Sequence, residues 1–91
     1  MKKYKRELPT VREAEVCRLL SLGCSVPETA KILGVAAPTA DNHKSRLMSK
    51  LGVNKAALLT RVAIQMKITS MADHLTMGEK RKSGRKKDGW N

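Results

Sequence analysis

The stretch of residues 35–53 constrains the fold of this chain most, because its apolar side chains recur at helical spacing. Ala40, Leu47 and Leu51 fall on one side of a helix with this spacing. Polar and basic side chains fall on the other side and along its rim. A helix with a single apolar stripe buries that stripe against a core. The pattern therefore predicts a helix over about 37–51, with one buried and one solvent-facing side.

Helix start signals divide the rest of the chain into further short helices. Thr10-x-x-Glu13 and Ser25-x-x-Glu28 have the spacing of a capping box, in which two residues satisfy each other's backbone N–H groups. Asn54 is a good N-cap for a fourth helix. No strand pattern occurs, so the sequence predicts an all-α fold, a small bundle of four helices. Glycines fall at the expected helix ends, at Gly23, Gly34 and Gly52.

Residues 64–77 leave two alternatives open. Their apolar side chains continue at i, i+4, i+7 and i+11, which suits one long fourth helix. Alternatively, Ser70 caps a separate short helix with Asp73 at its third position. Either alternative predicts a helical extension over 69–77.

The chain divides into three parts by composition. Residues 1–7 form a basic arm, and residues 8–77 hold the helix signals. Residues 78–91 are rich in Gly, Lys and Arg without apolar periodicity, which predicts a basic flexible tail. Trp90 in that tail is isolated and is assigned no role.

The charge of the chain points to an anionic partner. Its 91 residues carry a net charge of +11, which attracts nucleic acid, an anionic membrane or an acidic protein. Tyr4 and Trp90 are the only aromatic residues, which argues against single-strand binding by base stacking. No signal peptide and no apolar run of membrane-spanning length is present. We therefore expect a cytoplasmic protein. A basic membrane-surface peptide would fit the charge but not the capped, turn-punctuated helices, so we expect no membrane partner.

The cysteines and histidines give no sign of a metal or an active site. Cys17 and Cys24 occur without a CxxC motif or a Cys/His cluster, so we expect no metal, and reduced thiols fit the cytoplasm. Cys17 is expected to be buried, and Cys24, in a turn, to be exposed. His43 and His74 have no catalytic partner set and no phosphate-binding loop occurs, so we predict no catalytic residue and no enzyme.

The solvent-facing side of the 37–51 helix carries side chains that suit the edges of DNA bases. Arginine prefers guanine, asparagine prefers adenine, and aspartate can accept a hydrogen bond from the cytosine amino group. The candidate base-reading residues are Asp41, Asn42, Ser45 and Arg46. The residues that flank this face, where phosphates would lie, are Thr39, His43, Lys44 and Lys50.

Several motifs along the chain occur in the order of a known family. The third predicted helix has Thr39, His43, Leu47 and the run Lys50-Leu51-Gly52-Val53 at the spacing T-V-x-x-H-x-x-x-I-x-x-K-L-G-V. Upstream stand Leu8-x-x-x-Arg12-Glu13-x-Glu15-Val16 and Gly23-x-Ser25-x-x-Glu28-x-Ala30-x-x-Leu33. Over about residues 8–68 the chain resembles the LuxR/GerE-type helix-turn-helix DNA-binding domain.

The resemblance implies sequence-specific binding of double-stranded DNA by a bacterial transcriptional regulator. It implies that the helix over about 37–51 enters the major groove. It also implies that the second helix packs across the third and aims its N-terminus at the backbone, where Ser25 and nearby N–H groups would hold a phosphate. No cofactor and no small-molecule ligand is expected.

The resemblance further implies a homodimer through the last helix of the family domain. The candidate interface residues are Leu58, Val62 and Met66. About seven residues precede the motifs, so we expect a stand-alone domain without the receiver or sensor of larger family members.

Two other interpretations fit parts of the sequence. Asp41 departs from the family, whose members usually carry Lys or another non-acidic residue there, and phosphates repel a carboxylate in the groove. The chain could instead be a protein-interaction module that heterodimerises with a related regulator, with weak or no specific DNA binding. Arg12-Glu13 and Ser25-x-x-Glu28 also resemble region 4 of a sigma factor, although His43 and the run 50–53 favour the LuxR/GerE type.

Overall fold

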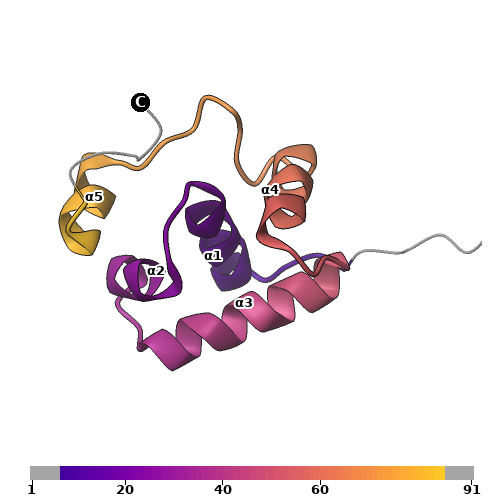
Figure 1. Cartoon of the computed structure of the whole chain (residues 1–91), viewed down its shortest axis with the longest axis horizontal. Coiled ribbons are helices and arrows are strands. Elements are labelled where there is room, and N and C mark those ends of the chain that lie inside the picture. Colours follow the sequence, from indigo (N-terminus) through magenta and orange to yellow (C-terminus); the bar gives the residue numbers. More distant parts are fainter. Residues whose placement is uncertain (1–6, 86–91) are drawn as a thin grey trace, which may run out of the picture.

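Five helices and no strand form the part of the chain that the computed structural model describes, residues 7–85 (Figure 1). The all-α prediction is confirmed, with one helix more than the four expected. Helix α1 packs against α3 and α4, and α2 packs against α3 and α5. The helices are α1 Val11–Ser21, α2 Val26–Leu33, α3 Ala37–Leu51, α4 Ala56–Gln65 and α5 Met77–Ser83.

The first two helices begin at the predicted capping boxes. In α1, the Glu13 N–H donates to Thr10 Oγ1 at 3.1 Å, and the Thr10 N–H donates to Glu13 Oε1 at 2.9 Å. In α2, Ser25 and Glu28 exchange the same pair of bonds at 3.2 and 2.9 Å. Gly23 follows α1 with a φ of +94°, a conformation that favours glycine. These local predictions are confirmed.

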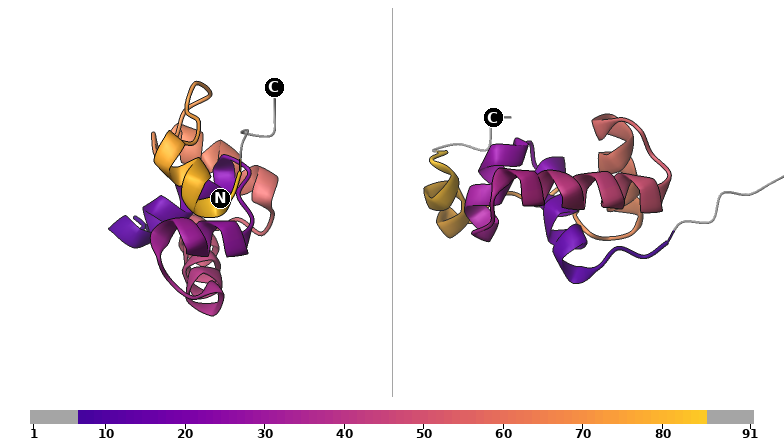
Figure 2. Two further views of the ribbon diagram at one scale, coloured as in Figure 1. Left: turned by 90° about the vertical axis from the view of Figure 1, so that its left-hand side faces the viewer. Right: turned by 90° about the horizontal axis from the view of Figure 1, so that it is seen from below.

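Helix α3 has the predicted bounds and one buried side. Ala40, Leu47 and Leu51 are at most 1 % exposed. Leu47 and Leu51 belong to a buried cluster, called the first core cluster below, together with Cys17 and Leu59. This cluster links α3 to α1 and α4. The helix therefore lies along one edge of the molecule with its packing partners on one side (Figures 1 and 2).

The predicted N-cap of the fourth helix is wrong by one residue. Helix α4 begins at Ala56, its N-cap is Lys55, and no side chain caps it. Lys55 is extended, with φ −139° and ψ 145°, so Asn54 lies outside the first turn and cannot cap it as predicted.

The predicted helical extension over 69–77 is also wrong. Helix α4 ends at Gln65, and the chain continues without helix to Thr76. The apolar residues of this segment serve two cores, because Ile68 packs on the first cluster, whereas Leu75 is 1 % exposed in a second cluster. That second cluster contains Leu19, Cys24, Ile32 and Leu75.

Residues 77–83 form α5, so the prediction of a flexible tail beginning at residue 78 is wrong there. Thr76 and Glu79 form a capping box that starts the helix, a signal that the basic composition of the segment obscured. The expected arm also has a contact, since the Glu7 N–H donates to the Lys50 carbonyl at 3.0 Å. The rest of the arm, residues 1–6, and the end of the tail with Trp90, residues 86–91, lie outside the described residues.

Arg18 of α1 forms ion pairs with the C-terminal segment, residues 73–85. Its Nε donates to Asp73 Oδ2 at 2.9 Å, and its Nη1 donates to Glu79 Oε2 at 2.7 Å. Its Nη2 reaches Asp73 Oδ1 at 3.2 Å and the His74 carbonyl at 3.1 Å. The segment is thus held by a forked ion pair as well as by Leu75.

These contacts shift the pKa values of both carboxylates downward. The Arg18 hydrogen bond holds the pKa of Asp73 below its ordinary 3.8, against an opposing effect of burial. Burial raises the pKa of Glu79, but the Thr76 N–H and Arg18 together lower it further, to below 4.5. Both carboxylates are therefore ionised at neutral pH.

Candidate nucleic-acid interface

The four predicted base-reading residues share the exposed side of α3. Asp41, Asn42, Ser45 and Arg46 are all exposed, whereas the apolar stripe of the helix is buried on the opposite side. Asp41 and Arg46 are five positions apart, which places them on different sides of this outer face. An ion pair of Asp41 would suit Lys44, three positions after it, better than Arg46, because residues three apart are neighbours on a helix.

The predicted phosphate residues of α3 do not all occupy the flank of this face. Thr39 is exposed and His43 half-buried, and their spacing puts them on one flank with Lys50. Lys44 is half-buried and lies four residues from both Ala40 and Met48, so it stands beside the buried stripe. Thr39, His43 and Lys50 therefore share the predicted flank of the outer face, and Lys44 does not.

Lys50 has a partner inside the fold. Its Nζ donates to Glu13 Oε1 at 2.8 Å, and Glu13 is only 3 % exposed. The Lys50 hydrogen bond holds the pKa of Glu13 below 4.5, although burial opposes it. Lys50 thus neutralises a buried carboxylate, a role that the sequence did not reveal because the two residues are 37 positions apart.

The N-terminus of α2 is partly occupied by its own capping box. Ser25 is exposed, but its Oγ accepts from Glu28, and its N–H donates to Glu28. The Thr29 N–H donates to the Ser25 carbonyl, and Pro27 has no N–H. Of the nearby N–H groups, that of Val26 is left to meet a phosphate, together with the Ser25 hydroxyl hydrogen.

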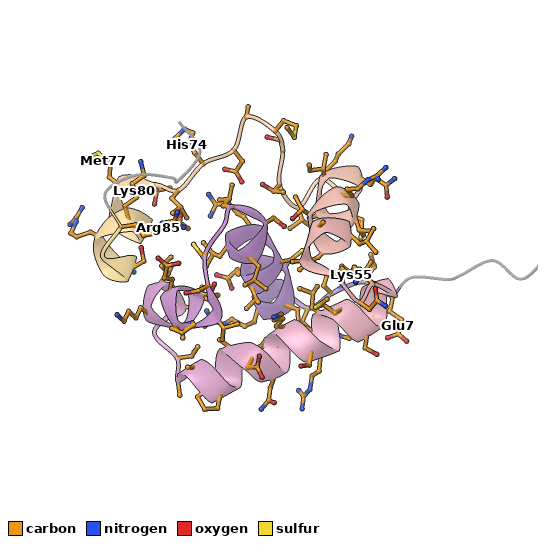
Figure 3. All side chains as sticks on the ribbon, in the orientation of Figure 1. Glu7, Lys55, His74, Met77, Lys80 and Arg85 are labelled. Atoms are coloured by element: carbon orange, nitrogen blue, oxygen red, sulfur yellow. The ribbon has the colours of Figure 1, made fainter. Side chains whose placement is uncertain are left out.

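Arg85 stands beside this N-terminus, which sequence reasoning missed. Its Nη1 donates to the Gly23 carbonyl at 3.1 Å, and its Nε lies 3.7 Å from Glu28 Oε2. Figure 3 shows Arg85 and Lys80 together at the α5 end of the molecule, far from Lys55. The contact joins residues 62 positions apart, so no local pattern could have indicated it.

The three predicted dimer residues do not form one exposed surface. Leu58 is 41 % exposed, but Val62 is 5 % exposed and belongs to the first core cluster. Met66 packs partly against the same cluster. A shallow hollow of about 280 Å³ lies beside Leu58, with Val53, Arg61 and Gln65 among its lining residues. Leu58 is the exposed apolar residue of this surface.

The cysteines are both buried. Cys17 is 0 % exposed, as predicted, but Cys24 is 5 % exposed, so its predicted exposure is wrong. Cys24 lies in the second core cluster because Leu75 packs in that cluster and Arg85 reaches its sulfur. Burial raises the pKa of the Cys17 thiol to about 11 and also raises that of Cys24. Neither thiol is a reactive thiolate at neutral pH.

Two kinds of feature are absent from residues 7–85, the part of the chain that the structure describes. Within this range no group of three His, Cys, Asp or Glu residues is arranged to hold a metal ion. No helix in the same range has the length and apolarity needed to cross a bilayer.

The family comparison agrees with this geometry. Residues 9–63 match the model of the bacterial regulatory proteins of the luxR family, and these residues contain α1 to α3 and most of α4. The chain belongs to the luxR family. Residues 9–63 are therefore a helix-turn-helix DNA-binding domain of the kind that regulates transcription.

One curated relative matches a slightly longer stretch of the chain than the family model does. The transcriptional regulatory protein MctR of Rhizobium johnstonii is 38 % identical over 61 residues, which cover 67 % of this chain. The matched region spans only 28 % of the length of MctR. No solved structure matches the chain significantly.

Proposed function

We propose that this luxR-family domain binds double-stranded DNA in a sequence-specific manner and regulates bacterial transcription, with α3 in the major groove. The single observation that carries this proposal is the exposed set Asp41, Asn42, Ser45 and Arg46, opposite the buried stripe of α3. An α-helix fits the major groove, where these side-chain types can distinguish base pairs. The domain would act in the cytoplasm, where bacterial DNA lies.

Backbone contacts would set the register of α3. Thr39 and His43 flank its outer face, and Ser25 stands at the start of α2. Hydroxyl and imidazole N–H groups at these places can donate to phosphate oxygens. Lys44 lies beside the buried stripe, and its long side chain can still extend its ammonium towards a phosphate. Lys50 would contribute to DNA binding mainly by holding α3 to α1 through its ion pair with Glu13.

Dimerisation would use the outer surface of α4. Leu58 supplies exposed apolar area there, while Val62 and Met66 support it from the core side. A two-fold dimer would place two α3 helices on half-sites about one DNA turn apart. The preferred DNA would then carry a two-fold symmetric motif.

Selection from a random duplex library, followed by sequencing, tests this function. We expect a symmetric motif, and Arg46→Ala should then lose about 1–3 kcal/mol of binding free energy on one half-site and relax one base preference. The matched control is Arg61→Ala, which removes an exposed arginine from α4 and should leave half-site affinity unchanged.

Other results would redirect the proposal. If Arg46→Ala bound its half-site as tightly as wild type, α3 would not be the reading helix. Salt-sensitive binding without a motif would mean backbone binding alone. Failure to retain DNA would favour the heterodimer module, for which the exposed carboxylate of Asp41 on the reading face is the supporting observation.

A further inference from the structure

The C-terminal segment adds a structured element to the luxR-family domain. The family match ends at residue 63, but the chain folds back and places α5 against α2 (Figures 1 and 2). Leu75 and the Arg18 ion pairs fix this position. Helix α5 is therefore a docked part of the domain rather than a tethered tail.

The C-terminal end of α5 lies at the N-terminal end of α2. Arg85 Nη1 donates to the Gly23 carbonyl and its Nε approaches Glu28, two residues that lie before and after Ser25 in the sequence. Under the proposed docking, this end of α2 faces the DNA backbone beside the groove that α3 enters. The basic end of α5 is then next to the same stretch of backbone.

The charge of this end is strongly positive. Four cations, Lys80, Arg81, Lys82 and Arg85, fall within the six positions 80–85, and the neighbouring acid, Glu79, is ion-paired with Arg18 at 2.7 Å. Arg81 and Lys82 are exposed. Arg85 also offsets the carboxylate of Glu28, which would otherwise repel a phosphate approaching α2.

We propose that the basic end of α5 is a second, sequence-independent contact to the DNA backbone. It engages phosphates beside those contacted by the start of α2, and so widens the footprint of the domain beyond the groove filled by α3. The inference rests on the proposed DNA-binding function. Arg81 and Lys82 supply the charge, and Arg18 supplies the fixed placement.

The salt dependence of binding tests this contact. The full chain is titrated with a short duplex of mixed sequence, and the logarithm of the binding constant is plotted against the logarithm of salt concentration. The test variant is Arg81→Gln/Lys82→Gln. The control is Lys55→Gln/Lys67→Gln, which removes two exposed cations just before and just after α4 and makes the same change in net charge.

Each lost phosphate contact reduces the slope by about 0.9. The test variant should therefore reduce it by up to about 1.8 and bind on the order of tenfold more weakly near physiological salt, while the control keeps the wild-type slope. Equal slopes for wild type and test variant, or equal reductions in both variants, would overturn the α5 contact. Either result leaves the proposed function intact if wild type binds DNA, whereas absence of wild-type binding would reject the function itself.

Discussion

At the residue scale, the Glu13–Lys50 pair shows how one ion pair joins the start of α1 to the end of α3. Glu13 is buried and Lys50 half-buried, so the two partners are not equivalent. Removing the ammonium leaves a carboxylate inside the protein, whereas removing the carboxylate lets the lysine turn to water. The energetic cost of losing each partner should differ accordingly.

We expect Lys50→Met to reduce the free energy of unfolding by about 3 kcal/mol at neutral pH. Glu13→Gln should reduce it by only about 1 kcal/mol, because glutamine keeps an acceptor for the Thr10 N–H. Urea unfolding followed by circular dichroism measures both. Equal losses in the two variants would contradict the asymmetry.

The pH dependence of the same pair has a defined sign. The folded-state pKa of Glu13 is below its ordinary 4.5, so the stabilisation by the pair is complete above that value and is lost as pH falls through the folded pKa. The difference between wild type and Lys50→Met should therefore shrink as the pH is lowered below 4.5.

At the element scale, α3 begins without a side-chain cap. Ala36 occupies the N-cap with φ −72° and ψ 149°, a conformation that a serine N-cap adopts. Ala36→Ser should therefore stabilise the domain by about 1 kcal/mol. Thermal unfolding measures the gain, and Asn54→Ala serves as control, since Asn54 caps nothing at α4 and should change stability little.

The attachment of α5 is a second property at this scale. Arg18→Gln removes the ion pairs to Asp73 and Glu79, so we expect a loss of about 2 kcal/mol in the stability of the C-terminal segment. Hydrogen exchange should show faster exchange of the α5 amides while those of α1 and α3 stay protected. Unchanged protection of α5 would mean that Leu75 and its neighbours suffice to hold the segment.

At the scale of the whole molecule, the net charge of +11 acts oppositely on the two proposed associations. Added salt should weaken DNA binding by counterion competition, but strengthen dimerisation by screening repulsion between two basic chains. Sedimentation equilibrium without DNA, at low and high salt, measures the second effect. Leu58→Asp, at an exposed position, should weaken dimers without unfolding the domain, and an unchanged dimer constant would rule out this surface.

The sequence by itself determined what depends on near neighbours along the chain. The capping boxes of α1 and α2 span three residues, and the stripe of α3 repeats within a few turns, so both were predictable from spacing. The two faces of α3, and with them the candidate base-reading residues, follow from the same periodicity. The motif order also indicated the family that the comparison confirmed.

Only the tertiary structure decided what depends on residues distant in the chain. It gave Lys50 an internal partner 37 positions away and fastened Asp73 to Arg18 across 55 positions. It also buried Cys24 and Val62, and turned a segment that had looked like a flexible tail into α5. Such contacts have no local signature, because they form when separate helices pack together and Leu75 covers apolar surface that the first helices leave exposed.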